Sequence, residues 1–154
     1  MGHVRVRITL ANPERTDGAV EVEEALVDTG ATWTTIPRTL AQGLDLRVVG
    51  QAAVKTAAGP QQLDQSYAYI ELADKRMVTP LLISDTLETV LIGVITLEAM
   101  GLAVDPATGQ LKQSEVFLLL CSAEDAEAVR SELREAKVVG RVVRQESAER
   151  VVLA

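Results

Sequence analysis

A strict alternation of apolar and polar residues near the start of the chain limits its possible folds more than any other feature. The apolar members of the alternation are Val4, Val6, Ile8 and Leu10. A period of two places successive side chains on opposite faces, so the segment predicts a strand with one buried face. Asn12-Pro13 and Asp17-Gly18 are turn signals, and residues 19–27 resemble a returning strand. We therefore expect a hairpin at the start of the fold.

The composition favours a core built from aliphatic side chains. Hydrophobic residues make up 47% of the 154 residues and charged residues 24%, which is the mix of an ordinary globular protein. Aromatic residues are only 3%, so Val, Leu, Ile and Ala must fill the interior. This bias favours a sheet-rich, mainly β domain, and the length suits one domain with at most a small appendage.

The charge of the chain argues against two classes of partner. The formal net charge is −7 at pH 7, and the sequence pI is about 4.8. Phosphate backbones and anionic lipids attract positive fields, so we expect neither nucleic acid nor a membrane surface as partner. No apolar run approaches the roughly 20 residues that cross a bilayer, and the N-terminus lacks the apolar block of a signal peptide. A cytoplasmic protein is the expectation.

No motif for a cofactor or metal is present in the sequence. Cys121 is the only cysteine and follows three leucines, so a buried, inert thiol is favoured and an intramolecular disulfide is impossible. His3 is the only histidine, and no His/Cys cluster has the spacing of zinc ligands. Neither a dinucleotide-binding glycine motif nor a P-loop occurs. We expect no cofactor and no metal.

Further elements follow from periodicity and turn residues. The segments that resemble strands are 34–36, 47–54, 61–72, 77–84, 90–92, 102–104 and 110–111. Residues 57–60 form a flexible, turn-prone tip between the second and third of these segments. Residues 37–43 can hold one helical turn, and 95–100 form a short helix that Gly101 terminates.

The last 40 residues differ in character. An apolar strand over 115–121 precedes Ser122, which is a good N-cap for an amphipathic helix. The apolar face of that helix holds Ala126, Val129, Leu133 and Ala136. Residues 137–144 and 150–153 are strand-like, so this part predicts a small βαββ extension. The expected domains are 1–114 and 115–154.

The segment with the clearest chemistry is an acidic residue at the end of an apolar strand. Ala25-Leu26-Val27 leads into Asp28, Thr29 and Gly30, with Ala31 after them. The strand would anchor the carboxylate, and the Thr29 hydroxyl can tie one loop to another. Gly30 removes a side chain, so backbone N–H groups and a substrate can come close to the carboxylate.

These residues resemble the active-site signature of the retroviral-type, retropepsin-like aspartic proteases of clan AA. A second element, residues 90–93 followed by 97–102, resembles the apolar strand, glycine and helix near the end of such domains. The resemblance covers roughly residues 4–112 and is strongest to the bacterial and archaeal branch. It implies a closed β-barrel with a flap hairpin and one short helix.

The resemblance also implies a reaction and its residues. Asp28, Thr29 and Gly30 would be catalytic, in an endopeptidase whose two carboxylates share one proton and activate water. The chain has one Asp-Thr-Gly, so the pair requires a homodimer with Asp28 from each copy. The substrate would be a peptide or protein held beneath the flap. The expected substrate contacts are Ala31, Thr56, Ala57, Ala58, Gly59, Pro60 and Ile92.

Several alternatives stay open at this stage. Asp28 can be a turn residue, and Trp33 is more often a packing or interface residue than a substrate contact. The barrel can also serve as a non-catalytic peptide-binding or dimerisation module. Residues 123–152 resemble the C-terminal end of aminoimidazole-ribonucleotide-synthase-like proteins, but without that family's nucleotide site no function is carried over. The extension can reinforce the dimer, cover a sheet edge or block conventional dimerisation.

Overall fold

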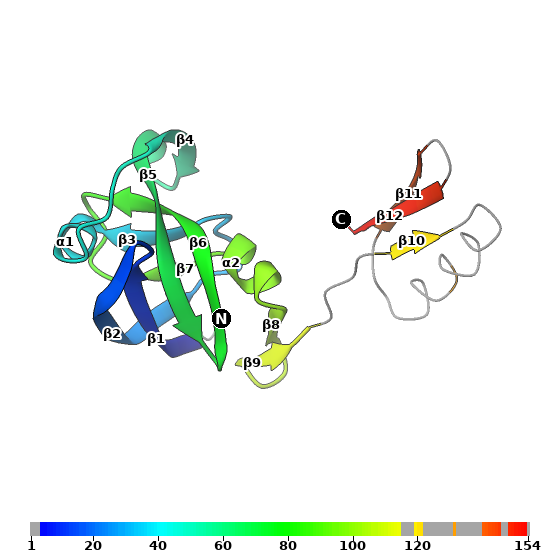
Figure 1. Ribbon diagram of the computed structural model, residues 1–154, viewed down its shortest axis with the longest axis horizontal. Helices are drawn as coiled ribbons and strands as arrows, with labels where there is room; N and C mark the ends of the chain where they lie inside the picture. Colours follow the sequence, from blue (N-terminus) through cyan, green and yellow to red (C-terminus); the bar gives the residue numbers. More distant parts are fainter. Residues whose placement is uncertain (1–3, 115–118, 122–130, 132–139, 146–147, 154) are drawn as a thin grey trace. The chain divides into compact units, whose positions relative to one another are not determined.

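The protein forms two compact units in the computed structural model (Figure 1). The structure describes residues 4–114, 119–121, 131, 140–145 and 148–153. One unit is Met1–Ser114 and the other is Glu115–Ala154. Each unit contains its own β-sheet.

The first unit begins with the expected hairpin. β1 (Val4–Asn12) pairs antiparallel with β2 (Arg15–Val27), from Val4 opposite Val27 to Asn12 opposite Arg15. The connection is therefore only Pro13-Glu14. Asp17 and Gly18 lie inside β2, so the second predicted turn is wrong.

The Asn12 side chain explains why the chain turns at the first signal. Its Oδ1 accepts the Glu14 N–H at 2.9 Å, and its Nδ2 donates to the Asp45 carbonyl oxygen at 2.7 Å. These bonds fix the turn before Asp17 is reached. The first half of β2 is exposed, so a glycine there costs little packing.

The remaining elements of the ring follow in the predicted order. They are β3 (Thr34–Pro37), α1 (Arg38–Gly43), β4 (Gly50–Thr56), β5 (Gly59–Leu72), β6 (Lys75–Ser84), β7 (Leu91–Ile92) and α2 (Val94–Ala99). The strand predicted over 47–54 starts three residues later, at Gly50. The tip of the β4–β5 hairpin is a tight turn at Ala57-Ala58, and Gly59 with φ of 106° already begins β5.

The strands close on themselves. Their order is β1-β2-β7-β3-β6-β5-β4, and β1 also pairs with β5, so six strands form a ring and β4 lies outside it. β2 runs parallel to β7, and β3 runs parallel to β6. The predicted mainly β fold with a closed sheet is confirmed.

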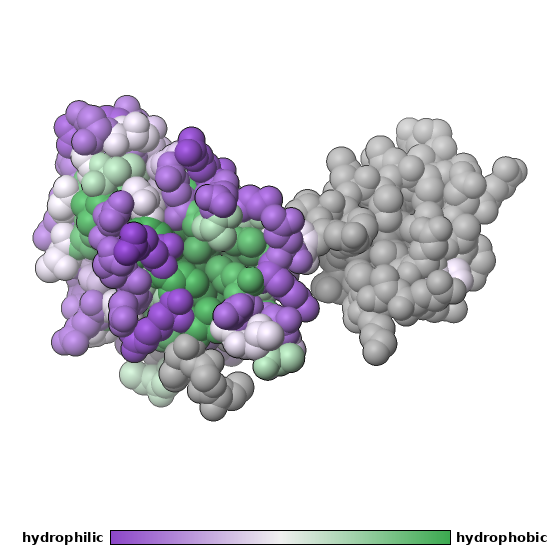
Figure 2. Space-filling view, turned by 90° about the horizontal axis from the view of Figure 1, so that it is seen from below, coloured by the Kyte–Doolittle hydropathy of each residue, from purple (hydrophilic) through white to green (hydrophobic). Residues whose placement is uncertain are grey.

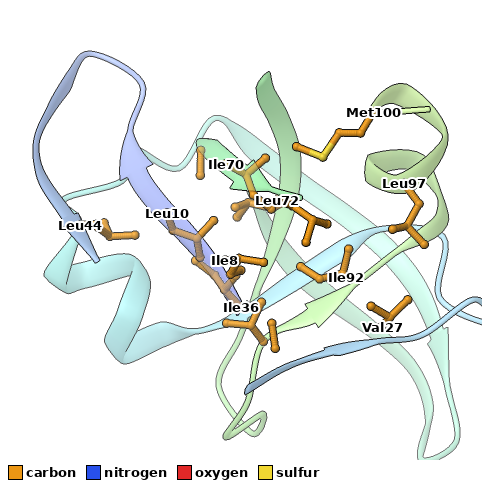
Figure 3. Packing of buried hydrophobic residues seen from close by; sticks show 14 of the residues in the cluster. Ile8, Leu10, Val27, Ile36, Leu44, Ile70, Leu72, Ile92, Leu97 and Met100 are labelled. Carbon is orange, nitrogen blue, oxygen red and sulfur yellow. The ribbon is translucent and has the colours of Figure 1, made fainter. Parts of the chain in front are cut away.

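Aliphatic side chains fill the ring, as the composition predicts. The fully buried large ones include Ile8, Leu10, Ile36, Ile70 and Ile92. Figure 3 shows them pointing toward one another from different strands, with Leu97 and Met100 added from the region of α2. No aromatic side chain belongs to this cluster among the residues that the structure describes.

A small hairpin completes the first unit. Gly101, with φ of 66°, ends α2 as predicted, and β8 (Leu102–Asp105) pairs with β9 (Gln110–Gln113). The predicted turn between these strands is confirmed.

The second unit contains a three-stranded antiparallel sheet in the order β10-β12-β11. Its strands are β10 (Leu119–Cys121), β11 (Gly140–Gln145) and β12 (Ala148–Leu153). Most of the helix predicted after Ser122 lies outside the described residues, as does the environment of the Cys121 thiol. Within the part of the chain that the structure describes, no helix is long and apolar enough to span a bilayer.

Candidate active site

Asp28 directly follows β2, whose last residues include the buried Ala25 and Val27, at the point where β2 pairs with β7. β7 pairs with β2 on one side, with Val27 opposite Ile92, and with β3 on the other, with Thr35 opposite Leu91. The Asp28 N–H donates to the Ile92 carbonyl oxygen at 3.0 Å. The loop 28–33 therefore connects β2 to β3, the two strands that flank β7. Both ends of the loop are fixed by backbone hydrogen bonds.

The carboxylate of Asp28 has a defined partner. The Gly30 N–H donates to Asp28 Oδ1 at 2.9 Å, and the Ala31 N–H donates to the Asp28 carbonyl oxygen at 3.1 Å. A Cβ added at Gly30 would lie 3.1 Å from the same Oδ1, which is tighter than an ordinary contact. A glycine here thus leaves the carboxylate undisturbed and lets the backbone amide approach it.

The N-terminus of α2 supports the far side of the loop. Val94 N–H donates to the Ala31 carbonyl oxygen at 2.9 Å, and Ile95 N–H donates to that of Thr32 at 3.1 Å. Gly93 packs directly on the loop, since an added Cβ would lie 2.4 Å from the Trp33 carbonyl carbon. The φ of Gly93 is −89°, which any residue can adopt, so glycine is needed here because no side chain would fit.

Three buried threonines hold the layer behind the loop. Thr96 Oγ1 lies 2.6 Å from Thr34 Oγ1 and 2.8 Å from Thr79 Oγ1, and each of the three is 0% exposed. Thr34 Oγ1 also accepts the Gly93 N–H at 3.1 Å. The network joins β3, α2 and β6 by hydrogen bonds in a buried layer, where such bonds are strongest. No local pattern in the sequence indicates this network, because its bonds join residues 62 and 17 positions apart.

A groove of about 770 Å³ opens in front of Asp28. Thr56, Ala57 and Ala58 at the tip of the β4–β5 hairpin line one part of it. Another part is lined by Ser84 at the end of β6, by Thr86 and Leu87 after it, and by Leu91. Asp28 and Lys55 are the only charged residues on its lining among the described residues. The groove thus combines a largely apolar or neutral surface with one carboxylate.

The predicted site residues are only partly brought together. Asp28, Gly30 and Ala31 line the groove, as do Thr56, Ala57 and Ala58. Thr29 is exposed beside Asp28 but does not line the groove within one copy of the chain, and its hydroxyl has no hydrogen-bond partner among the described residues. Gly59 and Pro60 follow the tip into β5 and lie off the groove.

The placement of Ile92 corrects one sequence prediction. Its side chain is 0% exposed and points into the core (Figure 3), so it does not line the groove. The alternation of the strand turns its neighbour Leu91 outward instead, and Leu91 does line the groove. The prediction identified the right strand but the wrong face.

The groove contains further residues that the sequence did not single out as contacts. They are Thr32, Trp33, Thr35, Val54, Gln61, Leu63 and Leu82. Trp33 and Thr35 follow the Asp-Thr-Gly motif closely, and Thr35 alternates with buried Thr34 and Ile36. That alternation was a usable signal for Thr35, whereas Leu63 and Leu82 depend on the closure of the ring. No cluster of acidic, histidine or cysteine residues suited to a metal occurs in the described part of the chain.

The sequence profile of the gag-polyprotein putative aspartyl protease family matches residues 17–99, more than half of the chain. The protein therefore belongs to this family. No curated protein matches the sequence. The match spans the loop with Asp28, the β4–β5 hairpin, β7 and α2.

Two solved structures match the retropepsin-like fold with TM-scores of at least 0.50. EIAV protease, in a complex with the inhibitor HBY-793, is 16% identical, with a TM-score of 0.52 over 65% of this chain and 89% of that one. The retroviral protease-like domain of Ddi1 from Leishmania major is 16% identical, with a TM-score of 0.50 over 73% and 90%. A retropepsin-like aspartic protease from Rickettsia conorii is 17% identical, with a TM-score of 0.48 over 68% and 77%. At these identities the likeness concerns the fold alone.

Proposed function

We propose that the protein is an aspartic endopeptidase that acts as a homodimer and cleaves peptide bonds between paired Asp28 carboxylates. The observation that carries this proposal is the position of Asp28. It is the one acidic residue on the described groove lining, it follows the buried end of β2, and its Oδ1 accepts the Gly30 N–H. Family membership supports the same chemistry.

The reaction needs two carboxyl groups in opposite protonation states. The ionised carboxylate takes a proton from a water molecule whose oxygen attacks the peptide carbonyl carbon, and the protonated partner donates to the carbonyl oxygen. In the second step the carboxyl group that took the water proton gives it to the peptide nitrogen, and the other carboxylate takes a proton from a hydroxyl group of the tetrahedral intermediate. The C–N bond breaks, the amine and the carboxylic acid leave, and the pair again holds one proton. Two close carboxyl groups share one proton, because ionising both is costly.

A second copy of the chain would supply the second carboxylate. The described groove of one copy holds a single acidic residue, and a twofold axis beside Asp28 would bring its equivalent close. The exposed Thr29 hydroxyl would then meet the partner's loop. Thr29 would thus act as a positioning residue that ties the two loops together. Separately from this loop, Figure 2 shows an apolar area between hydrophilic residues on one face of the first unit.

The substrate would be an extended peptide held beneath the β4–β5 hairpin. β4 has its only sheet neighbour in β5 among the described strands, so its other edge can bond a peptide backbone. Ala31, Thr56, Ala57 and Ala58, which line the groove, would contact the peptide. We place this activity in residues 1–114 and regard 115–154 as an extension.

Asp28→Asn tests the proposal most simply. With a peptide library as substrate, cleavage should fall by about 10²–10⁴-fold, the usual contribution of general acid–base catalysis. Sedimentation and thermal unfolding should match the unaltered protein. Asp17→Asn, at an exposed position of β2, is the matched control and should cleave normally. Full activity of Asp28→Asn would refute the proposed chemistry. If the unaltered protein cleaves no peptide, a non-catalytic module would be the better account, a dimerisation module if the protein is a dimer and a peptide-binding module if it is a monomer.

A further inference from the structure

Arg38, the first residue of α1, contacts two acidic residues from different segments. Its Nε and Nη2 donate to the two carboxylate oxygens of Asp85 at 2.6 and 3.2 Å. Its Nη1 donates to Asp64 Oδ2 at 2.6 Å, and Gln51 Nε2 donates to Asp64 Oδ1 at 3.1 Å. We call Arg38, Asp64, Asp85 and Gln51 the Arg38 cluster.

The cluster is more sheltered than the exposed ion pairs of the first unit. This holds for the pair of Arg38 and Asp64, whose side chains are 30% and 22% exposed, against 56% and 69% for the pair of Arg5 and Glu24. Asp85, the other partner of Arg38, is 70% exposed. A guanidinium has a rigid fork of donors, and here both sides of that fork are used. The bidentate contact with Asp85 fixes the orientation of the guanidinium plane, and the partly desolvated contact with Asp64 is stronger than an exposed ion pair.

The residues of the cluster lie at the base of two parts of the groove lining. Gln51 on β4 and Asp64 on β5 face each other across the hairpin, below its tip. Asp85 belongs to the turn in which Ser84 Oγ accepts the N–H groups of Thr86 and Leu87, both at 3.2 Å. Thr86 and Leu87 line the groove, as does Leu63 next to Asp64. Arg38 thus joins the root of the hairpin to the turn 84–87 on the groove lining.

We propose that Arg38 is a positioning residue that holds the β4–β5 hairpin and the turn 84–87 in register, and so sets peptide affinity without touching the reacting groups. This rests on the proposed function for its effect on cleavage. The coupling between the hairpin and the turn 84–87 does not depend on the proposed function, because it exists in the protein without substrate. Arg38 does not line the groove, and its role is carried by Asp64 and Asp85.

The charges of the cluster keep it intact in acid. Hydrogen bonding from Arg38, then from Gln51, lowers the pKa of Asp64 below its usual 3.8. Hydrogen bonding from Arg38 lowers the pKa of Asp85 in the same way, although nearby Asp64 opposes this slightly. A lowered carboxyl pKa means that the interaction is complete above the ordinary value and is lost only as the pH falls through the lowered one. The hydrogen bonds of Arg38 to Asp64 and Asp85 therefore persist at mildly acidic pH. The proposed pair of Asp28 carboxyl groups would be active in the same pH range.

The test compares the full chain with Arg38→Gln, Arg38→Lys and the control Arg15→Gln. The control breaks the exposed pair of Arg15 and Asp45, whose residues do not line the groove. Hydrogen exchange of the amides at 50–64 and 85–87 is measured without substrate, and KM and kcat are measured with a cleaved peptide. For Arg38→Gln we expect exchange and KM to rise by about tenfold, within the usual range of coupling between sites, with kcat within about twofold. Hydrogen exchange and KM of Arg38→Lys should lie between those of the unaltered protein and Arg38→Gln, because the lysine ammonium group keeps the charge but lacks the planar fork of donors.

Two results would overturn the role of Arg38. One is hairpin exchange in Arg38→Gln equal to that in Arg15→Gln. The other is a loss of kcat at unchanged KM, which would place Arg38 in the chemistry. If the unaltered protein cleaves no peptide, the proposed function fails, and the exchange measurement alone decides whether the Arg38 cluster couples the hairpin to the turn.

Discussion

The floor and the roof of the groove are built in opposite ways. The floor, which we define as the loop 28–33 with β7 and the start of α2, is held by backbone hydrogen bonds and by buried threonines. The roof, the β4–β5 hairpin from 50 to 64, has β4 as an end strand that is largely exposed. Under the proposed function, a carboxylate that meets its partner needs a rigid support, whereas a cover has to open for a peptide. The comparison teaches that backbone and buried hydrogen bonds are concentrated around Asp28 rather than in the hairpin that would cover it.

Gly93→Ala should have the largest effect on stability, because Gly93 packs directly against the loop of the floor. The added methyl group would lie 2.4 Å from the Trp33 carbonyl carbon and 2.8 Å from the Thr34 nitrogen, both of them backbone atoms. We expect a loss of about 3 kcal/mol or more, because backbone cannot move aside as a side chain does. Urea unfolding measures it. Gly18→Ala, where nothing lies within 4 Å, is the control, and equal losses in the two variants would refute the tight packing.

A matched pair of threonine variants compares floor and roof directly. Thr96 and Thr56 each make two hydrogen bonds through the hydroxyl group, one threonine buried and the other exposed. Thr96→Val should lower the free energy of unfolding by about 2 kcal/mol, since it leaves buried hydroxyl groups without a partner. Thr56→Val should cost less than about 0.5 kcal/mol, because water replaces the lost bonds.

The same pair separates stability from peptide binding. Thr56→Val should raise KM severalfold, because Thr56 Oγ1 accepts the Ala58 N–H and donates to the Gly59 carbonyl oxygen at the hairpin tip. Thr96→Ser keeps the hydroxyl group and should recover most of the stability lost in Thr96→Val. Similar unfolding losses for Thr96→Val and Thr56→Val would contradict the contrast between floor and roof.

Gly30→Ala should separate activity from stability within the floor. Its methyl group would press on Asp28 Oδ1 at 3.1 Å, while the rest of the residue is exposed. We expect kcat to fall by about 10²-fold, as small displacements of reacting groups do, with a change in unfolding free energy below about 1 kcal/mol. Steady-state kinetics and thermal unfolding on the same sample decide it. Unchanged kcat would show that this contact does not set the carboxylate position.

The smallest expected effect concerns the acid titration of the Arg38 cluster at the root of the roof. Carbon-detected NMR should show Asp64 and Asp85 titrating below 3.8, since hydrogen bonds from Arg38 lower both pKa values. Both midpoints should move upward in Arg38→Gln. Because the folded-state values are the lower ones, the stabilisation should be constant above about pH 4 and decline only at more acidic pH. Midpoints unaffected by the substitution would remove the electrostatic basis of the cluster.

Local patterns were sufficient to predict the individual strands of the floor and of the ring, whereas closure of the ring was implied by the family resemblance. The alternation from Val4 to Leu10 predicted β1, and the apolar strand before Asp28 predicted its anchored position. Turn residues located the tip of the roof and the end of α2 at Gly101. These features depend on neighbours in sequence, which a single chain displays directly.

Features that depend on distant residues could not be predicted in the same way. The outward face of β7 at Leu91, rather than Ile92, is decided by its pairing with β2 and β3. The contact of Arg38 with Asp85 spans 47 residues, and that of Thr34 with Thr96 spans 62. Asp17-Gly18 failed as a turn because the Asn12 side chain had already closed one. Closure of the ring decides the face of β7 and brings the distant partners of Arg38 and Thr34 into contact. The turn at Asn12 overrides the local preference of Asp17-Gly18.

A crystal structure of the assembled protein, with the separation of the paired Asp28 carboxyl groups measured, is the most direct test of the mechanism. Sharing one proton requires an oxygen–oxygen distance of about 2.5–3.0 Å across a twofold axis. We predict a homodimer with that distance and the Thr29 hydroxyl groups at the contact between loops. A monomer, or a dimer whose Asp28 groups lie beyond hydrogen-bond reach, would contradict the proposed peptidase.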